Sequence, residues 1–527
     1  MPIFSKVVAM ITPDVDNFSR QYALKKSQVL FTRLAADLDT PVSLKMKLAG
    51  DQKNAFMLES VTGGEVRGRY SIIGMKPDLI WKCQGSESFI NRDARFDDEA
   101  FTAVQAPPLE ALRALLAESF IDLPEDLPQA SAGLFGYLGY DMIRLVEDLP
   151  DMNPDPLALP DAVFLRPSVV AVLDGVKGEV ILVAPVWYDP AISAKAAYAK
   201  SAERIQDAMR YLERPLPDPR SLGAPEEAPN PRSNFSKDAY IAAVEKAKDY
   251  IRAGDIFQVV PAQRWTQDFA LPPFALYRSL RRTNPSPFMF YFNFDGFQVI
   301  GASPEILVRV FGREVTVRPI AGTRPRGATS EEDNANEADL LADKKELAEH
   351  LMLLDLGRND VGRVAKLGTV KPTEEFIIER YSHVMHIVSN VVGELHENQD
   401  ALSALSTLSY HAGVAEGLAA DQSFRQAAFE VKSEDFPELI RLDNGGLAAL
   451  RLDETQAPRP QPLPEIREDA MKAWRVEALR EALLAQADDL KSQLEAKTMR
   501  IEEIGGILHQ ETGLNRQERP ATTTANV

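Results

Sequence analysis

Residues 380–395 read RYSHVMHIVSNVVGEL, and this run decides how the later part of the chain is expected to fold. It carries β-branched residues that favour extended backbone, Val384, Val388, Val391 and Val392. Successive side chains of a strand point to opposite faces, so His383 and His386, three residues apart, are not expected to share a metal ion. A lone strand histidine is more often a satisfied core residue, but its reference pKa near about 6.5 also suits proton transfer at neutral pH.

A helix is predicted ahead of this strand, in the stretch DLLADKKELAEHLMLLDLGRND at 339–360. Glu346 and Glu349 lie three residues apart, which places both carboxylates on one helix face. Such a pair can hold Mg²⁺, a hard ion that prefers oxygen ligands and keeps several waters. The spacing alone favours a plainer interpretation, in which Lys345 and Glu349 form an i,i+4 ion pair on a solvated face.

Further towards the N-terminus, the segment RPIAGTRPRG spans residues 318–327. It places Gly322 and Thr323 at the end of a predicted strand, where backbone N–H groups and a hydroxyl could bind a carboxylate. Arg324 and Arg326 add positive charge, although a basic turn without function would look the same. Glycines alone are a weak signal: GLFGYLGY at 133–140 lacks the helix and distant acid of a dinucleotide site and instead predicts close packing of strands.

The arrangement of helical and extended segments predicts an α+β protein with several parts. Short apolar runs mixed with helical stretches such as 108–120 and 191–211 indicate an N-terminal domain over residues 1–212. A proline-rich connector follows at 213–235. Ser236 and Gly254 then bound a predicted helix, and DIFQVVPAQRW, FMFYFNF and FQVIGAS read as strands of a second domain at 236–405.

The last part of the chain, residues 406–527, has a different character. It contains a predicted hairpin, LIRLDNGGLAALRL, that turns at 444–446, and then a proline run. A charged amphipathic helix is expected from about Glu465 to Ala496, ahead of a polar end that is expected to be disordered. Nothing in this tail has the appearance of a catalytic motif.

Charge and composition exclude several classes of partner. The chain has 527 residues, with 59 basic and 78 acidic side chains and a net charge of −19, which would repel phosphate backbones and anionic membrane surfaces. No nucleic acid or membrane partner is therefore expected. A short apolar N-terminal run, no apolar stretch of membrane-spanning length, and a single cysteine, Cys83, favour a cytoplasmic location.

Several ordered strings resemble the chorismate-utilising enzymes, and most closely component I of anthranilate synthase. They are LES at 58–60, GRYSIIG at 68–74, GYLGYD at 136–141, NPSPFMFY at 284–291, PIAGTRPRG, KELAEHLMLLDLGRNDVGRV and RYSHVMHIVSNVVGEL. The resemblance ends at about Leu405. It implies the fold of that family, antiparallel sheets flanked by helices, and conversion of chorismate and ammonia to anthranilate and pyruvate in tryptophan biosynthesis.

The resemblance also assigns roles to individual residues. It implies that Gly322 and Thr323 contact chorismate, that Glu349 ligates Mg²⁺ with Glu346 nearby, and that His386 lies beside the substrate ring. Departure of the 4-hydroxyl needs a proton, for which His386 and Glu346 are both candidates. The sequence does not choose between them.

Residue 321 separates this chain from one group of relatives. The related aminodeoxychorismate synthases usually carry a nucleophilic lysine there, whereas Ala321 offers no amine, which favours direct attack by ammonia. No glycine-flanked cysteine nucleophile of a glutaminase is visible, so a separate glutamine amidotransferase subunit is expected to supply the ammonia. The family's inhibitory L-tryptophan site is implied at Ser60, Lys47, Pro287, Phe288 and Met289.

After Leu405 the chain departs from the family pattern. The resemblance would continue with strings that supply a second magnesium glutamate, a tyrosine and an arginine for the substrate, and further strands, so the catalytic domain is predicted to be truncated. Residues 406–527 resemble, less specifically, the C-terminal part of a parvulin-type peptidyl-prolyl isomerase, as in a chimeric chain. Two functions therefore stay open, an anthranilate synthase subunit and a non-catalytic chimera that retains a tryptophan-binding domain. A peptidyl-prolyl isomerase is disfavoured, because the tail lacks a complete catalytic domain.

Overall fold

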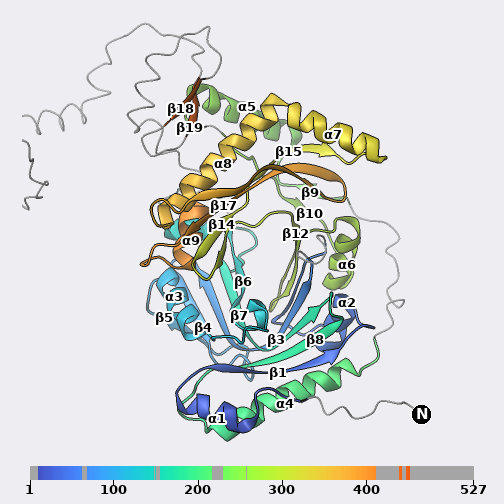
Figure 1. Ribbon diagram of the computed structural model, residues 1–527, viewed down its shortest axis with the longest axis vertical. Helices are drawn as coiled ribbons and strands as arrows, with labels where there is room; N and C mark the ends of the chain where they lie inside the picture. Colours follow the sequence, from blue (N-terminus) through green and yellow to red (C-terminus); the bar gives the residue numbers. More distant parts are fainter. Residues whose placement is uncertain are drawn as a thin grey trace, which may run out of the picture. The chain divides into compact units, whose positions relative to one another are not determined.

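The computed structural model describes residues 10–61, 68–147, 149, 155–216, 230–256, 258–410, 438–441 and 447–450 (Figure 1). The chain divides into two compact units, one of Met1–Glu430 with Pro437–Leu450 and one of Val431–Phe436 with Arg451–Val527. All described residues belong to the first unit. The expected helix at 465–496, the polar C-terminal end and most of the proline-rich connector lie outside the described residues.

A large antiparallel sheet is the centre of the N-terminal part. Its main strands, in spatial order, are β1 (Gln28–Ala35), β8 (Glu179–Val186), β7 (Ala162–Asp174), β3 (Tyr70–Gln84), β2 (Ala55–Glu59), β11 (Phe288–Asn293) and β12 (Gln298–Ser303). Three shorter strands pair at its side, β4 (Glu87–Asn91), β5 (Phe101–Val104) and β6 (Phe135–Leu138). β7 and β8 are apolar almost throughout and buried along nearly their whole length, as expected of central strands covered on both faces.

Helices cover this sheet and supply much of its core. They are α1 (Val15–Ala23), α2 (Pro41–Leu48), α3 (Pro108–Glu118), α4 (Ala194–Leu212) and α6 (Pro273–Thr283), with the short helices η1 (Gln129–Ser131) and η2 (Tyr140–Leu145). Phe18, Leu44 and Ile205 are fully buried in one cluster with Leu182 of β8. In Figure 1, α1 and α4 lie together beneath β1. The packing of apolar helix faces against the sheet accounts for helices that are too short to be stable alone.

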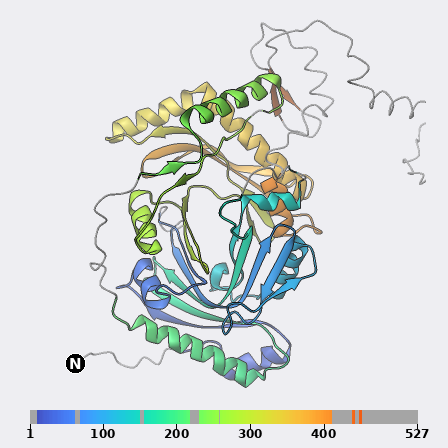
Figure 2. The ribbon, with the colours of Figure 1, turned by 180° about the vertical axis from the view of Figure 1, so that it is seen from behind.

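A second antiparallel sheet, with its own helices, carries the later part of the chain. Its strands are β13 (Arg309–Phe311), β14 (Glu314–Val317), β15 (Ile320–Pro325), β16 (Lys371–Arg380) and β17 (Val384–Glu394), and β17 pairs with β14, β15 and β16. The helices are α7 (Ser330–Ala342), α8 (Lys344–Val364) and α9 (Ala401–Tyr410). Leu354 and Val361 of α8 are buried against Val315 and Val391, so α8 packs across this sheet (Figures 1 and 2).

Most local predictions in the middle of the chain are confirmed. Helix α5 (Lys237–Ala253) begins after Ser236, whose side chain accepts a hydrogen bond from the backbone N–H of Ala239, and ends at Gly254 with φ +81°. The glycine run at 133–140 packs closely, since a Cβ on Gly136 would lie 1.8 Å from the carbonyl oxygen of Val163. The hairpin strands near the end are β18 (Glu438–Arg441) and β19 (Leu447–Leu450).

The strand predicted for DIFQVVPAQRW is wrong over most of its length. Among the described residues of this segment, Trp265 alone lies in a strand, β10 (Trp265–Thr266), which pairs with β9 (Arg232–Ser233). Pro261 has no N–H for a sheet ladder, which explains why pairing does not continue through the segment. FMFYFNF and FQVIGAS do form β11 and β12, and these extend the sheet built by the N-terminal residues through pairing of β11 with β2.

No described helix is both long enough and apolar enough to cross a lipid bilayer.

Candidate active site

The predicted substrate-binding residues meet at an irregularity between β15 and β17. Ala321 pairs with Ile387 and Thr323 pairs with His386, so Gly322 is an extra residue that bulges from the ladder. Gly322 adopts φ +71°, and an added Cβ would lie 3.0 Å from the Ile387 side chain. Glycine is therefore required here by both backbone conformation and space.

The bulge brings His386 against both predicted chorismate contacts. Its Nδ1 lies 3.1 Å from the carbonyl oxygen of Gly322 and 3.0 Å from Oγ1 of Thr323. Because a carbonyl can only accept a hydrogen bond, Nδ1 carries the hydrogen, and in the neutral ring Nε2 holds the lone pair. The ring of Tyr381 packs edge-on against that of His386, with centroids 5.5 Å apart. The hydrogen bond from Nδ1 to the Gly322 carbonyl selects one tautomer, in which Nε2 is the nitrogen able to exchange a proton.

The predicted magnesium carboxylates converge on one cation. Glu346 and Glu349 lie on the first turns of α8, and an oxygen of each is 3.3 Å from Nζ of Lys345. The ammonium therefore stands where a shared cation would sit, and its side chain is 76% exposed, so it can move away. Within the described residues no group of three or more acid, histidine or cysteine side chains could hold a metal. Two carboxylates fit Mg²⁺ if water and substrate supply its other ligands.

Arg324 links the start of α8, which carries these carboxylates, to the bulge. Arg324, next to Thr323, places Nη2 2.7 Å from Oδ2 of Asp343. Asp343 is the N-cap of α8, and its side chain accepts hydrogen bonds from the backbone N–H groups of Lys345 and Glu346. These contacts, with the packing of α8 on β15 and β17, fix the start of α8 relative to Thr323. Glu346 and Glu349 thus sit on an element held directly to the bulge.

One further titratable group near β15 was missed by sequence reasoning. Glu305 follows β12 and accepts a hydrogen bond from the backbone of Ile320 at the start of β15. The residue as a whole is exposed, yet desolvation of its carboxyl raises the pKa to about 6. A carboxyl with such a pKa can give up a proton near neutrality. A single glutamate in a connecting segment has no spacing pattern by which it could have been found.

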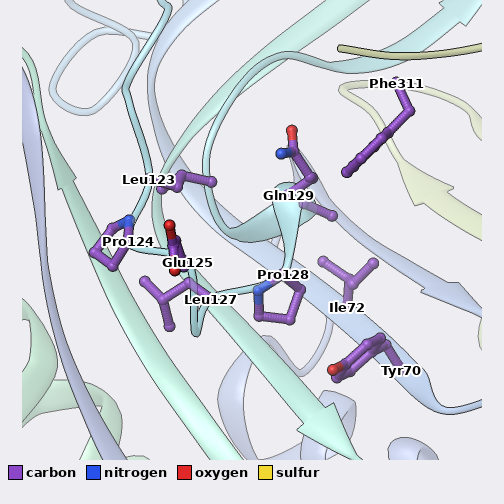
Figure 3. Close-up of a pocket in the computed structure, with 10 residues that line it drawn as sticks. Tyr70, Ile72, Leu123, Pro124, Glu125, Leu127, Pro128, Gln129 and Phe311 are labelled. Atoms are coloured by element: carbon purple, nitrogen blue, oxygen red, sulfur yellow. The ribbon is translucent and has the colours of Figure 1, made fainter. Parts of the chain in front are cut away.

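One cavity among the described residues lies away from this site. It has a volume of about 620 Å³ and is lined by Tyr70 and Ile72 of β3, by residues 123–125 and 127–130, and by Phe311 of β13 (Figure 3). None of the predicted catalytic or substrate-binding side chains faces it. Its lining is mostly apolar, with Glu125 and Gln129 as the polar exceptions.

The residues predicted to bind tryptophan are brought together in part. Met289 pairs with Glu59 across β11 and β2, and the N–H of Val61 donates to the carbonyl of Ser286 at 3.1 Å. The segment 287–289 therefore runs beside Ser60. Met289 is buried and Phe288 is 43% exposed. Lys47, on α2, forms an ion pair with Asp39 at 2.8 Å.

The single cysteine is not a reactive thiol. Cys83 is fully buried at the end of β3. Burial raises the pKa of its thiol to about 12, so almost no thiolate exists at neutral pH.

Comparison with known proteins gives these residues a context. Residues 54–412 match the family of chorismate binding enzymes. The chain is 71% identical over 390 residues to anthranilate synthase component 1 of Cereibacter sphaeroides. This alignment covers 74% of this chain and 78% of that relative. It is 46% identical over 378 residues to anthranilate synthase component 1 of Pseudomonas aeruginosa, covering 71% of this chain and 75% of the relative.

Solved structures agree with the sequence comparison. The crystal structure of anthranilate synthase component I from Streptococcus pneumoniae superposes with a TM-score of 0.56 at 30% identity, over 71% of this chain and 79% of that one. MenF, the menaquinone-specific isochorismate synthase of Escherichia coli, gives a TM-score of 0.50 at 16% identity, over 82% of this chain and 87% of that one, which is a likeness of fold. The predicted class, antiparallel sheets flanked by helices, is confirmed.

Proposed function

The chain belongs to the family of chorismate binding enzymes, among the component 1 proteins of anthranilate synthase, and from that premise we propose that its β15–β17 bulge binds chorismate. The reaction combines chorismate with ammonia and yields anthranilate, pyruvate and water. A C–N bond forms at the ring, the 4-hydroxyl leaves as water, and the enolpyruvyl side chain departs as pyruvate. We place this reaction in tryptophan biosynthesis.

The observation that carries this proposal is the meeting of Gly322, Thr323 and His386 at one bulge. The Gly322 backbone and the Thr323 hydroxyl offer polar groups to a substrate carboxylate, and His386 offers Nε2 for proton exchange. Positioned acid or base groups contribute roughly 10²- to 10⁴-fold to a rate. His386 and Glu346 are the proposed proton-transfer residues, with Glu305 as a further candidate on the β15 side.

We propose Mg²⁺ as the cofactor, held by Glu349 with Glu346 beside it. The convergence of both carboxylates on Lys345 Nζ supports a cation position there. Bound metal would neutralise charge on the substrate carboxylate. The protein's own contribution is to keep both glutamates on one helix face, whose start Asp343 and Arg324 hold in place.

The nitrogen source and the regulation complete the proposal. A component 1 protein works with a second component, which we propose to be a glutamine amidotransferase subunit that delivers ammonia. Ala321 is 9% exposed and carries no amine, which supports attack by ammonia itself rather than by a lysine as in aminodeoxychorismate synthases. We place inhibitory L-tryptophan at Ser60 and Pro287–Met289, and the whole reaction in the cytoplasm.

A second candidate function is tryptophan binding without turnover. It is favoured by one observation: β2, which ends next to Ser60, and β11, which carries Phe288 and Met289, pair within the described large sheet, whereas the alignment leaves about a fifth of the Cereibacter sphaeroides relative uncovered. The two candidates differ in whether anthranilate forms.

The test joins the C-terminal segment of the Cereibacter sphaeroides relative after Leu405 and supplies chorismate, MgCl₂ and ammonium chloride. Anthranilate fluorescence should rise, and His386→Ala should lower the rate by roughly 10²-fold or more. His383→Ala is the matched control, since His383 precedes β17 and its Nδ1 contacts Ser382. If His386→Ala and the parent had equal rates, the assigned role of this site would be wrong.

A further inference from the structure

The side-chain hydroxyl of Ser389, in β17, connects three elements of this part of the fold. Its Oγ is hydrogen-bonded to Nε2 of His350, in α8, at 2.7 Å. The backbone N–H of Phe376, in β16, donates to the same oxygen at 3.0 Å. His350 and Ser389 are both fully buried. A single buried hydroxyl therefore links α8 and β16 to the strand that carries His386.

Irregular pairing of β16 explains how its backbone reaches this hydroxyl. The register against β17 shifts between Glu374 and Ile377, and Phe376 has no partner residue in that ladder. Its N–H is therefore available to Ser389, while its ring packs edge-on against the ring of His350, with centroids 5.0 Å apart. The helix and both strands thus meet at one buried point.

The contact carries costs that an apolar core would not have. Nδ1 of His350 is buried and has no hydrogen-bond partner among the described residues. Phe376 adopts φ +51°, a left-handed backbone conformation that bulky side chains rarely occupy. Both features are unfavourable, and replacing a buried polar pair by apolar groups of the same shape is often nearly neutral for stability. Stability alone therefore does not explain why a histidine and a serine meet here.

The pair joins the two halves of the proposed site. His350 directly follows Glu349 in α8, and Ser389 lies three residues after His386 in β17. The apolar contacts between α8 and this sheet are non-directional, so by themselves they let the helix slide along the strands. A hydrogen bond is directional, and a buried one fixes the position of the helix along the sheet.

The other polar contact of α8 with this sheet lies nearer the surface. The ion pair of Arg324 with Asp343 holds the first residues of the helix, but its side chains are 22% and 31% exposed. Solvent weakens such a pair. His350 and Ser389 are shielded from water, and the N–H of Ser389 also donates to the carbonyl of Pro319, just before β15, at 3.2 Å. The buried pair therefore relates α8 to both strands of the bulge.

We propose that His350 and Ser389 are positioning residues, whose hydrogen bond fixes where the carboxylates of Glu346 and Glu349 lie relative to His386. The inference rests on the proposed function, because it concerns the proposed metal-binding and proton-transfer groups. Neither residue of the pair needs to touch the substrate. A misplacement of about 1 Å can lower a rate by roughly 10²-fold, so a small shift of α8 is enough to matter.

The first measurement uses the full chain without metal or substrate. Spin labels on Ala348→Cys of α8 and Glu394→Cys of β17, both at exposed positions, report the distance between the helix and the strand. The native Cys83 is fully buried and stays unlabelled. Double electron–electron resonance should give one narrow distance distribution for the parent. His350→Phe keeps a ring but removes the bond to Ser389, so the distribution should broaden or shift.

The second measurement is turnover in the chain completed after Leu405 with the C-terminal segment of the Cereibacter sphaeroides relative. His350→Phe should lower kcat by roughly 10- to 10²-fold at saturating chorismate, ammonium and MgCl₂. His350→Gln keeps a polar group that can reach Ser389 and should restore most of the rate. Leu354→Ala is the matched control on the same helix: it removes a buried apolar contact, so it should lower the melting temperature and leave kcat unchanged.

An unchanged distance distribution in His350→Phe would overturn the proposal, and so would an unchanged kcat in that variant. A fall in kcat that Leu354→Ala reproduces would do the same, because the cause would then be a loosened helix and not the lost bond to Ser389. Failure of the proposed function has a different signature. The completed parent would form no anthranilate, while the distance in the full chain would still change in His350→Phe.

Discussion

Arg281 of α6 holds the buried carboxylate of Glu59 on β2 with two parallel hydrogen bonds, from Nε to Oε2 at 2.7 Å and from Nη2 to Oε1 at 2.6 Å. Tyr277 donates its hydroxyl to the same carboxylate at 2.9 Å. Paired, charge-assisted hydrogen bonds of this kind fix geometry as well as adding stability. These hydrogen bonds hold the C-terminal end of β2 next to α6 and so fix the position of Ser60, the residue that follows Glu59.

Removing one side of this pair should destabilise the chain. Arg281→Met leaves the Glu59 charge buried with only Tyr277 as partner, and the loss of one partner from a buried pair costs about 3 to 5 kcal/mol. Because Arg281 is 30% exposed, solvent lowers the expected loss to roughly 2 kcal/mol. Thermal unfolding followed by circular dichroism measures it. The double variant Glu59→Gln/Arg281→Met should recover part of the loss, and a double variant as unstable as the sum of both single variants would contradict a direct interaction.

Tryptophan binding should depend on Ser60. Ser60→Arg places a long cation beside the segment 287–289, so we expect titration calorimetry to show saturable L-tryptophan binding by the parent and none by the variant. Ser279→Arg, at an exposed position of α6, is the matched control and should bind normally. Equal binding by Ser60→Arg and the parent would remove the assignment.

Magnesium dependence should follow the two carboxylates of α8. In the chain completed after Leu405, Glu349→Gln removes a charged oxygen ligand and should raise the Mg²⁺ concentration for half-maximal anthranilate formation about tenfold or more. Glu337→Gln is a suitable control, since Glu337 of α7 pairs with Arg380 of β16 and not with Lys345. An unchanged metal requirement in Glu349→Gln would show that Mg²⁺ binds elsewhere.

Stability should depend on pH through Asp360. This residue is 6% exposed and its Oδ1 has no hydrogen-bond partner among the described residues, so desolvation raises its pKa from the ordinary value to about 6. The folded chain then binds this proton more tightly than the unfolded chain does. Proton binding by Asp360 therefore stabilises the folded chain fully below about pH 4, and this contribution is lost as the pH rises through 6.

Asp360→Asn removes this dependence. We expect the variant to be more stable than the parent at pH 7, by at most about 3 kcal/mol, with the difference vanishing near pH 4. Melting temperatures at the two pH values provide the measurement. The same gain at both pH values would point to a cause other than ionisation.

Local signals in the sequence predicted local structure well and long-range geometry poorly. The Ser236 cap and the Gly254 terminus of α5 could be read directly, because each depends on residues a few positions away. Thr323 and His386 are 63 residues apart, so no spacing rule could predict their contact, and only resemblance to a family linked them. The bulge at Gly322 arises from strand pairing, and Glu59 meets Arg281 across 222 residues. In the segment around Pro261 a local signal was itself misleading: the residues have strand propensity but find no partner strand, so the predicted strand was wrong.

The chain by itself should form little or no anthranilate. The described residues supply Gly322, Thr323 and His386 with the α8 carboxylates, while the alignment leaves about a fifth of the Cereibacter sphaeroides relative uncovered. Excess Mg²⁺ could compensate for one absent carboxylate, since this ion commonly keeps several waters. It cannot supply neighbours for β12 and β15, and a polar group left unpaired when buried costs about 1 to 3 kcal/mol against a total stability of roughly 5 to 15.

The decisive measurement compares two samples at equal concentration with chorismate, MgCl₂ and ammonium chloride: the chain alone and the intact relative. We expect anthranilate fluorescence near the blank for the first and full turnover for the second. Addition of Mg²⁺ to about 50 mM separates the two explanations for the low rate, since a weakened metal site responds to excess metal and a missing part of the sheet does not. Turnover by the chain alone comparable with that of the intact relative would falsify the prediction and would mean that residues 406–527 complete the site.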